Sequence, residues 1–245
     1  AKEDVKKALE HSEKISESYS RFVPWETLNY LNYKSIFDVH LGDGQEKFMS
    51  ILFSDIRDFT KLCESMSPSD ILKFLNSYFG RLSPIIRAHG GTIDKFIGDC
   101  VMAIFDDPQK AVKASIEIQR ALISYNLERY FGGREEINAG IGICHGPVVV
   151  GPLGFDRKLE ITVVSDTVNI ASRLDGLCKE LSARVLVAGL EPGNMRWPDG
   201  VVAYSHGDMQ IKGKDCRVKV VEVIDTRLAE INPEEFGLIG SLTSG

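Results

Sequence analysis

Hydrophobic and polar residues change period several times along the chain, and each change predicts a different element. A short apolar run over residues 48–54 predicts a buried strand that ends at Asp55. Apolar residues then recur at helical spacing from Ser67 to His89 and predict an amphipathic helix. Its predicted apolar stripe consists of Ile71, Leu72, Leu75, Phe79, Leu82 and Ile86.

The ends of this helix carry local signals. Ser67 is a favourable N-cap, and Asp70 is placed to complete a capping box. Pro84 predicts a kink, and Gly90-Gly91 predicts the C-terminal end. A helix over residues 67–89 is therefore expected.

Downstream, two short strands over 92–97 and 100–105 flank Gly98-Asp99, a pair typical of a two-residue hairpin turn. A second amphipathic helix is predicted over 108–129, followed by strands over 137–144 and 148–150. Strand, helix, hairpin, helix and strand in this order predict an α+β fold with a ferredoxin-like βαββαβ core. Extra C-terminal elements are expected after this core: strands over 159–164, 184–188 and 218–224, and a helix over 166–179.

The predicted organisation has three parts: an N-terminal helical linker and connector over 1–46, the main domain over 47–225, and a C-terminal tail over 226–245. Within residues 1–20, apolar residues recur at roughly helical spacing among Lys, Glu and Ser. This pattern is compatible with a short coiled coil and equally with a frayed, solvated terminus.

Composition disfavours several classes of function. The net charge is −6 and no long basic run is present, which disfavours broad electrostatic binding to nucleic acid. The five cysteines are widely spaced without a C-x-x-C, so we expect a reducing compartment and neither a disulfide framework nor a zinc site. No apolar run approaches the length of a membrane span, and no signal peptide is recognisable. We expect a cytoplasmic location without direct membrane insertion, and the start at Ala1 is compatible with an upstream sensor or membrane domain.

Two aspartates are predicted to meet at one edge of the sheet. In a βαββαβ sheet the first strand pairs with the hairpin and ends at the edge where the hairpin turns. Asp55 stands at that strand end and Asp99 in that turn. Adjacent carboxylates repel unless cations neutralise them, and Mg²⁺ combines one or two carboxylates with phosphate oxygens and water. The pair indicates a metal site, although a helix cap and a turn former explain the same two residues.

Three blocks of sequence resemble the signature blocks of class III nucleotide cyclases. They are FSDIRDFT over 53–60, DKFIGDCVMAIF over 94–105 and SDTVNIASR over 165–173. The resemblance covers roughly residues 47–225 in order and spacing, and it is strongest to bacterial adenylyl cyclases. The segments that end at Pro24 and Gly44 also look like the connector that precedes bacterial members.

The resemblance implies a metal site and a substrate. Asp55 and Asp99, with the carbonyl of Ile56, would bind two Mg²⁺ or Mn²⁺ ions per active site. Asn169 and Arg173 would act as catalytic residues on the ribose and the reacting phosphate. The residues implied to bind ATP are Lys95 and Thr162 at the adenine, Lys212 at the terminal phosphates, and Phe59 and Thr60 in the tight connection after the first strand, where backbone N–H groups suit phosphate oxygens.

The resemblance further implies a homodimer in which each site takes its aspartates from one subunit and the remaining residues from the other. From the residues alone, Asn169 and Arg173 lie one helical turn apart and off the expected apolar stripe, which a solvated polar face also explains. A Lys donor and a Thr acceptor match N1 and the amino group of adenine, whereas guanine would leave buried groups unpaired. Lys95 is equally compatible with a surface position or an ion pair with Asp94 or Asp99.

One position departs from the family pattern. Many members carry an arginine that binds phosphate where this chain has Gly140, and Cys144 stands where histidine is usual. One phosphate contact is therefore missing or comes from another residue, such as Arg157 or Lys158.

The sequence thus predicts an adenylate cyclase that converts ATP to 3′,5′-cyclic AMP and pyrophosphate by two-metal-ion catalysis at a homodimer interface. Two alternatives stay open: a catalytically weak or dead domain that acts as a regulatory dimerisation module, and a guanylate cyclase. A diguanylate cyclase is disfavoured because its hairpin would read Gly-Gly-Asp/Glu-Glu-Phe, whereas this turn reads Ile-Gly-Asp-Cys-Val over 97–101.

Overall fold

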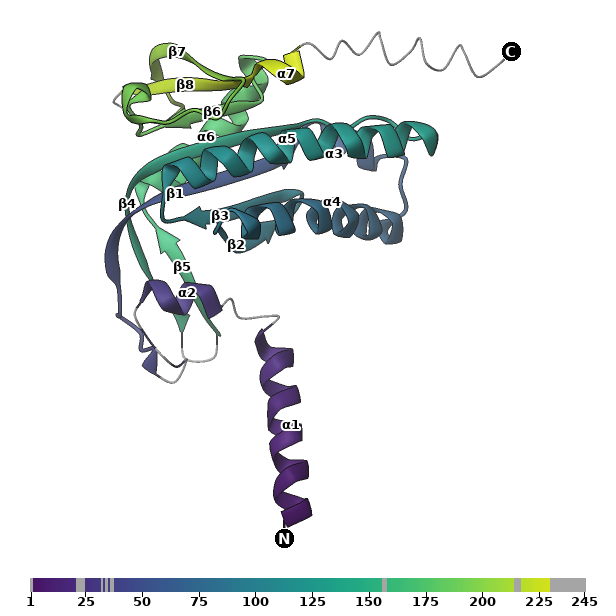
Figure 1. Ribbon diagram of the computed structural model, residues 1–245, viewed down its shortest axis with the longest axis vertical. Coiled ribbons are helices and arrows are strands. Elements are labelled where there is room, and N and C mark those ends of the chain that lie inside the picture. The colour runs from purple at the N-terminus through teal and green to yellow at the C-terminus, as the bar shows by residue number, and fades with distance from the viewer. Residues whose placement is uncertain are drawn as a thin grey trace. The chain divides into compact units, whose positions relative to one another are not determined.

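The computed structural model describes residues 2–20, 25–31, 33, 35, 38–155, 158–213 and 217–229 (Figure 1). The chain divides into two compact units. The hairpin unit comprises Ala1–Lys47 and Val149–Val164, and the main unit comprises Phe48–Val148 and Ser165–Gly245. Residues 21–24, Arg157 and most of the predicted tail lie outside the described residues.

The core of the main unit follows the predicted βαββαβ order. It consists of β1 (Gln45–Ile56), α4 (Pro68–Ala88), β2 (Thr92–Ile97), β3 (Cys100–Phe105), α5 (Pro108–Phe131) and β4 (Ala139–Phe155), with the five-residue α3 (Phe59–Cys63) after β1. The strands lie in the order β2-β3-β1-β4, and β3 pairs with both β1 and β2 in antiparallel fashion. This order confirms the predicted ferredoxin-like arrangement.

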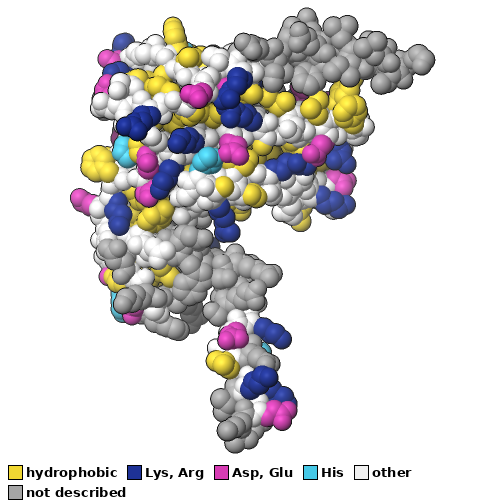
Figure 2. Space-filling model, viewed as in Figure 1, with side chains coloured by type: hydrophobic (Ala, Val, Ile, Leu, Met, Phe, Trp, Pro, Cys, Tyr) yellow, Lys and Arg dark blue, Asp and Glu magenta, His cyan; other side chains and the backbone are white. Residues whose placement is uncertain are grey.

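Both long helices cover the same face of this sheet (Figure 1). One hydrophobic core joins α4 and α5 to β1, β3 and β4, and it includes Leu52, Tyr78, Phe105, Ile118 and Ile141, all of them buried. Because successive strand residues point to opposite faces, Gly140 and Gly142 of β4 face the other side of the sheet. On the face of the molecule that Figure 2 shows, acidic and basic side chains are interspersed.

Helix α4 begins as predicted, and its buried row includes Leu82 and Ile86 of the predicted stripe together with Phe74 and Tyr78, which were not in it. The Ser67 hydroxyl accepts from the Asp70 N–H at 3.2 Å and donates to the Asp70 carboxylate at 2.7 Å. The prediction of Leu72 in the buried stripe is wrong: it is 62% exposed, because it stands two residues before Phe74 and so on nearly the opposite side of the helix.

The β2–β3 hairpin has the predicted strand bounds and the predicted two-residue turn. Ile97 pairs with Cys100 across the turn, and Gly98 has a φ of +63°, which glycine adopts without the steric cost of a Cβ atom. The register shifts between Ile93 and Lys95, so Asp94 stands in a bulge of the edge strand β2.

The C-terminal part adds α6 (Asp166–Glu180), β6 (Val185–Ala188), a 3₁₀ turn (Pro192–Asn194), β7 (Val201–Gln210) and β8 (Arg217–Asp225). Strand β6 runs parallel to β4, and β8 and β7 extend the sheet in antiparallel fashion. Strand β7 was not predicted. It lies at the sheet edge with only Val201 buried, so its sequence lacks a clear apolar alternation.

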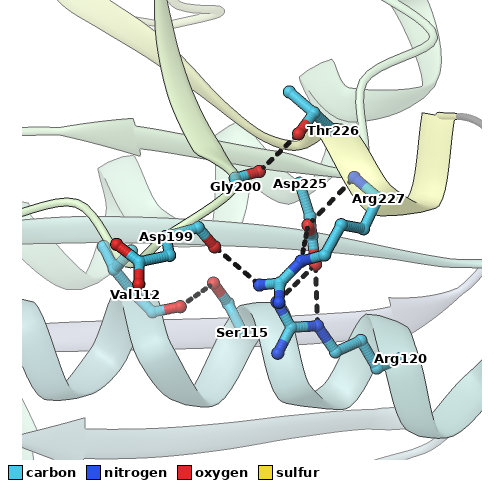
Figure 3. A network of polar contacts seen from close by, with 8 residues as sticks. All are labelled: Val112, Ser115, Arg120, Asp199, Gly200, Asp225, Thr226 and Arg227. Atoms are coloured by element: carbon cyan, nitrogen blue, oxygen red, sulfur yellow. Dashed lines mark hydrogen bonds and ion pairs between the residues drawn. The ribbon is translucent and has the colours of Figure 1, made fainter.

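A buried carboxylate fixes the end of β8 (Figure 3). Asp225 accepts from Arg120 Nε of α5 at 2.7 Å and from Arg227 Nε at 3.3 Å. Arg227 also donates to the Asp199 carbonyl at 2.7 Å, and the Thr226 hydroxyl donates to the Gly200 carbonyl at 2.8 Å. These contacts join the short helix α7 (Thr226–Ala229) to the turn before β7.

The hairpin unit contains α1 (Lys2–Ser20), α2 (Trp25–Tyr30) and the pairing of β5 (Lys158–Val164) with the second half of β4. Thr162 pairs with Gly151, where a Cβ atom would stand 2.6 Å from the Asp43 carbonyl oxygen. Because residues 2–20 form α1, the N-terminal segment is helical. Its role as a coiled coil stays a prediction. In the described part of the chain, no helix has the length and apolar character needed to cross a membrane.

Candidate active site

The two predicted aspartates meet in the structure. Asp55 is the penultimate residue of β1, and Asp99 occupies the turn between β2 and β3. The Asp99 carboxylate accepts a hydrogen bond from the Ile56 N–H at 3.2 Å. Burial and contact with the Asp99 carboxylate raise the pKa of Asp55 well above its usual range. The predicted topology thus places Asp55, Ile56 and Asp99 together.

These groups suit a divalent cation that takes its remaining ligands from a bound substrate and water. The Asp55 Oδ1 atom is buried and has no hydrogen-bond partner among the residues that the structure describes. Burying such an oxygen costs free energy unless it is protonated or bound by a cation. Among the described residues, no group of three or more His, Cys, Asp or Glu side chains could hold a metal by itself. Two carboxylates and a carbonyl match Mg²⁺, which takes further ligands from phosphate and water.

The aspartates open onto a cleft of about 480 Å³ in the main unit. Phe59 and Thr60, in the first turn of α3, line it, and Phe59 stacks on Phe74 with ring centroids 6.4 Å apart. The cationic residues on its wall are Arg57, Lys61 and Lys179.

A third carboxylate, which sequence reasoning missed, lies in the same cleft. Asp175 of α6 lines it beside Gly140, and its carboxylate accepts from the backbone N–H of Asp55. Burial raises the pKa of Asp175 to about 7, although Arg57 acts in the opposite direction. A Cβ atom at position 140 would stand 2.8 Å from Asp175 Oδ1. Gly140 was noted as a departure, but nothing in the sequence connected it with Asp175.

The two predicted catalytic residues form a second group. Asn169 and Arg173 are exposed residues of α6, whereas Thr167, Ala171, Leu174 and Cys178 are its buried ones. The Arg173 guanidinium lies beside Gly213, with its Nη2 atom 3.2 Å from the position a Cβ atom would take there. Lys212 precedes that glycine, so α6 and the segment after β7 bring Arg173 and Lys212 into one neighbourhood.

The residues assigned to the adenine lie in different units. Lys95 of β2 belongs to the main unit, and its Nζ atom lies 3.5 Å from Asp94 Oδ2, an ion pair that the sequence analysis allowed. Thr162 is a buried residue of β5 in the hairpin unit. Their role in reading a base stays a prediction.

Comparison with known proteins identifies the family. Residues 44–223 match the family described as the adenylate and guanylate cyclase catalytic domain. An adenylate cyclase from Anabaena cylindrica is 36% identical over 217 residues, which make up 86% of this chain and 43% of that protein. The chain therefore belongs to this family, and it spans less than half of that curated relative.

Solved structures agree on the fold. The adenylyl cyclase CyaB from P. aeruginosa superposes with a TM-score of 0.66 at 30% identity, covering 74% of this chain and 96% of that one. The guanylyl cyclase Cya2 superposes with a TM-score of 0.61 at 31% identity, covering 74% and 93%. These similarities establish the class III cyclase fold, and they include proteins named for either nucleotide.

Proposed function

We propose that this chain converts ATP to 3′,5′-cyclic AMP and pyrophosphate. The observation that carries the proposal is the juxtaposition of Asp55 and Asp99, with the buried Asp55 Oδ1 atom that lacks a hydrogen-bond partner among the described residues, at the sheet edge of a cyclase fold. The identity of 36% to an adenylate cyclase supports ATP as the substrate. Since the proposed substrate is ATP, we place the domain in the cytoplasm, and an upstream sensor stays part of the proposal.

The reaction is an attack of the ribose 3′-hydroxyl on the α-phosphorus, with pyrophosphate as the leaving group. Asp55, Asp99 and the Ile56 carbonyl would hold two Mg²⁺ or Mn²⁺ ions, which neutralise phosphate charge and lower the pKa of the hydroxyl. Arg173 offsets the charge that builds on the phosphorus, because its guanidinium stays protonated. Asn169 orients the ribose, Lys212 binds the terminal phosphates, and Phe59 and Thr60 bound the phosphate end of the cleft.

We further propose that each site forms between two copies of the chain. Of the described residues that line the cleft, none belongs to the group of Asn169, Arg173 and Lys212. A two-fold dimer would bring that group from one copy to the aspartates of the other, and it would generate two equivalent sites.

A regulatory module without activity is the second candidate. It is favoured by Gly140, which provides no cation, and by Asp175, which adds a third carboxyl group to the cleft. The presence of Asp55, Asp99, Asn169 and Arg173 favours the enzyme. A guanylate cyclase is the alternative that the likeness to Cya2 supports.

One experiment separates these functions. The purified chain is incubated with ATP or GTP and with Mn²⁺ or Mg²⁺, and the products are identified by chromatography and mass spectrometry. We expect cyclic AMP, and we expect Asp55→Ala or Asp99→Ala to lower its formation by more than about 100-fold, since even an outer-shell partner of a metal contributes 10–100-fold. Asp106→Asn changes an exposed aspartate paired with Lys110 and serves as the control. Cyclic GMP as the main product would identify a guanylate cyclase, and no product with either nucleotide would favour the regulatory module.

A further inference from the structure

The segment from Asp55 to Asp58 contacts one face of α6 at successive points. The Asp55 N–H donates to the Asp175 carboxylate, and Asp58 pairs with Lys179 at 2.6 Å. Between them, Arg57 Nη2 donates to the Cys178 carbonyl at 3.2 Å and to the Ala183 carbonyl. Residues 175, 178 and 179 follow the i, i+3, i+4 spacing of a single helix face.

Arg57 makes the contact that is specific to the helix end. The last carbonyls of a helix lack partners within the helix. Here the Cys178 carbonyl accepts from the Ala183 N–H at 2.9 Å as well as from Arg57. The two acceptors of Arg57, the Cys178 and Ala183 carbonyls, lie at the C-terminal end of α6 and just beyond it. Arg57 therefore joins the connection after Asp55 to the end of this helix.

Glycines of β4 hold the same helix close to the sheet. A Cβ atom at Gly142 would stand 2.2 Å from the Ala171 carbonyl oxygen and 2.3 Å from the Asp175 nitrogen. At Gly146 it would stand 2.7 Å from Thr167 Oγ1. The helix backbone thus rests directly on the strand, and a shift at one end is carried along α6 rather than absorbed in side chains.

Asn169 and Arg173 are exposed on this helix, away from the residues that face the sheet. Arg173 precedes Cys178 by five residues, a rise of about 7.5 Å along the helix. Whatever fixes the C-terminal end of α6 therefore also fixes the place of Arg173. Under the proposed function, Arg173 works in the site whose aspartates belong to the other copy.

We propose that Arg57 is a positioning residue. It acts through α6 of its own chain on the active site that the other copy's aspartates complete. This inference rests on the proposed function and deepens it. It follows that the two sites of a dimer are joined: the connection that follows Asp55 in one site is tied to the helix that supplies Asn169 and Arg173 to the other.

Mixed dimers test this directly. One copy carries Asp55→Ala and the other Arg173→Ala, so that one intact site remains. The first copy supplies only the helix to that site, and the second supplies only the aspartates. Two affinity tags isolate the mixed dimer after co-expression. Arg57→Gln is then placed in the helix-supplying copy or in the aspartate-supplying copy, and kcat and KM for ATP are measured for each arrangement.

We expect Arg57→Gln in the helix-supplying copy to lower kcat at least fivefold with KM changed less than twofold, and Arg57→Lys to restore part of the loss. Arg87→Gln, at an exposed position of α4, is the matched control in the same copy. Both arrangements contain one altered copy per dimer, so a folding defect lowers dimer yield and melting temperature equally in both. Activity within twofold of the unaltered mixed dimer, or an equal loss in both arrangements, would overturn the inference. Inactivity of the mixed dimer before Arg57 is changed would instead contradict the shared site, and the inference would fall with it.

Discussion

The Oδ1 atom of Asp175 lies 2.8 Å from the position that a Cβ atom would take at Gly140. The Asp175 carbonyl oxygen and Cys178 Cβ are also close, each at 3.2 Å. A side chain at position 140 and the Asp175 carboxylate therefore compete for the same space.

We expect Gly140→Ala to lower the free energy of unfolding by about 1–3 kcal/mol through overpacking. The double variant with Gly140→Ala and Asp175→Ala should lose less free energy of unfolding than the sum of the two single variants, by at least about 0.5 kcal/mol. Urea unfolding of the four proteins measures this coupling. Gly80→Ala, in the interior of α4 with open space around it, is the control and should raise stability by about 0.5–1 kcal/mol. Additive effects at positions 140 and 175 would show that the two side chains do not compete.

The acidic cleft predicts a pH dependence of stability in the absence of metal. Burial and Asp99 raise the pKa of Asp55, so the folded chain binds more protons than the unfolded chain above the usual carboxyl range. The free energy of unfolding should therefore fall as pH rises from about 5 to about 8. Asp55→Asn should make this fall smaller, and Mn²⁺ should stabilise the parent at about pH 8 but not the variant.

Urea unfolding in EDTA at both pH values measures the effect. Asp106→Asn, whose side chain is 59% exposed in the parent, should keep the parental slope. An equal slope in parent and Asp55→Asn would contradict the assigned carboxylate contact.

The backbone of Asp58 is left-handed, with φ of 55° and ψ of 29°. Gly adopts this conformation without strain, whereas Ala bears a cost of about 1–2 kcal/mol. Both Asp58→Gly and Asp58→Ala lose the exposed ion pair with Lys179, which contributes little. We therefore expect the glycine variant to melt at a higher temperature than the alanine variant. Equal melting temperatures would mean that the loop relaxes and that position 58 is not strained.

The assignment of Lys95 and Thr162 to adenine predicts a preference for ATP. We expect kcat/KM for ATP to exceed that for GTP by at least about tenfold, because guanine would leave buried polar groups unpaired. Lys95→Glu combined with Thr162→Cys should reduce this ratio. The ratio is measured from initial rates with each nucleotide. Similar efficiencies in the unmodified chain would contradict the base-reading pair.

Local chemistry and topology were predictable from the sequence. The Gly98-Asp99 turn and the Ser67 cap each depend on residues only a few positions apart. A short stretch of sequence is therefore enough to predict them. The contact of Asp55 with Asp99 followed because the βαββαβ order fixes which strand ends meet.

Features set by tertiary packing were missed. Leu72 belongs to an apolar pattern, but the orientation of α4 is decided by the row from Phe74 to Ile86. Asp175 and Arg57 lie within or beside recognised blocks, yet their roles depend on how closely α6 approaches β4 at Gly140 and Gly142. A pattern of single residues does not report that distance.

We infer that a site assembled from two copies of this chain makes cyclic AMP. Asp55→Ala and Arg173→Ala should each abolish activity in a pure dimer. In a mixed dimer one site carries both lesions and the other carries neither, and random pairing makes half of the dimers mixed. Co-expression of the two variants should therefore restore cyclic AMP formation to roughly a quarter of the parent level. Mixed dimers that form, as shown by isolation through two tags, and yet remain inactive would contradict the account.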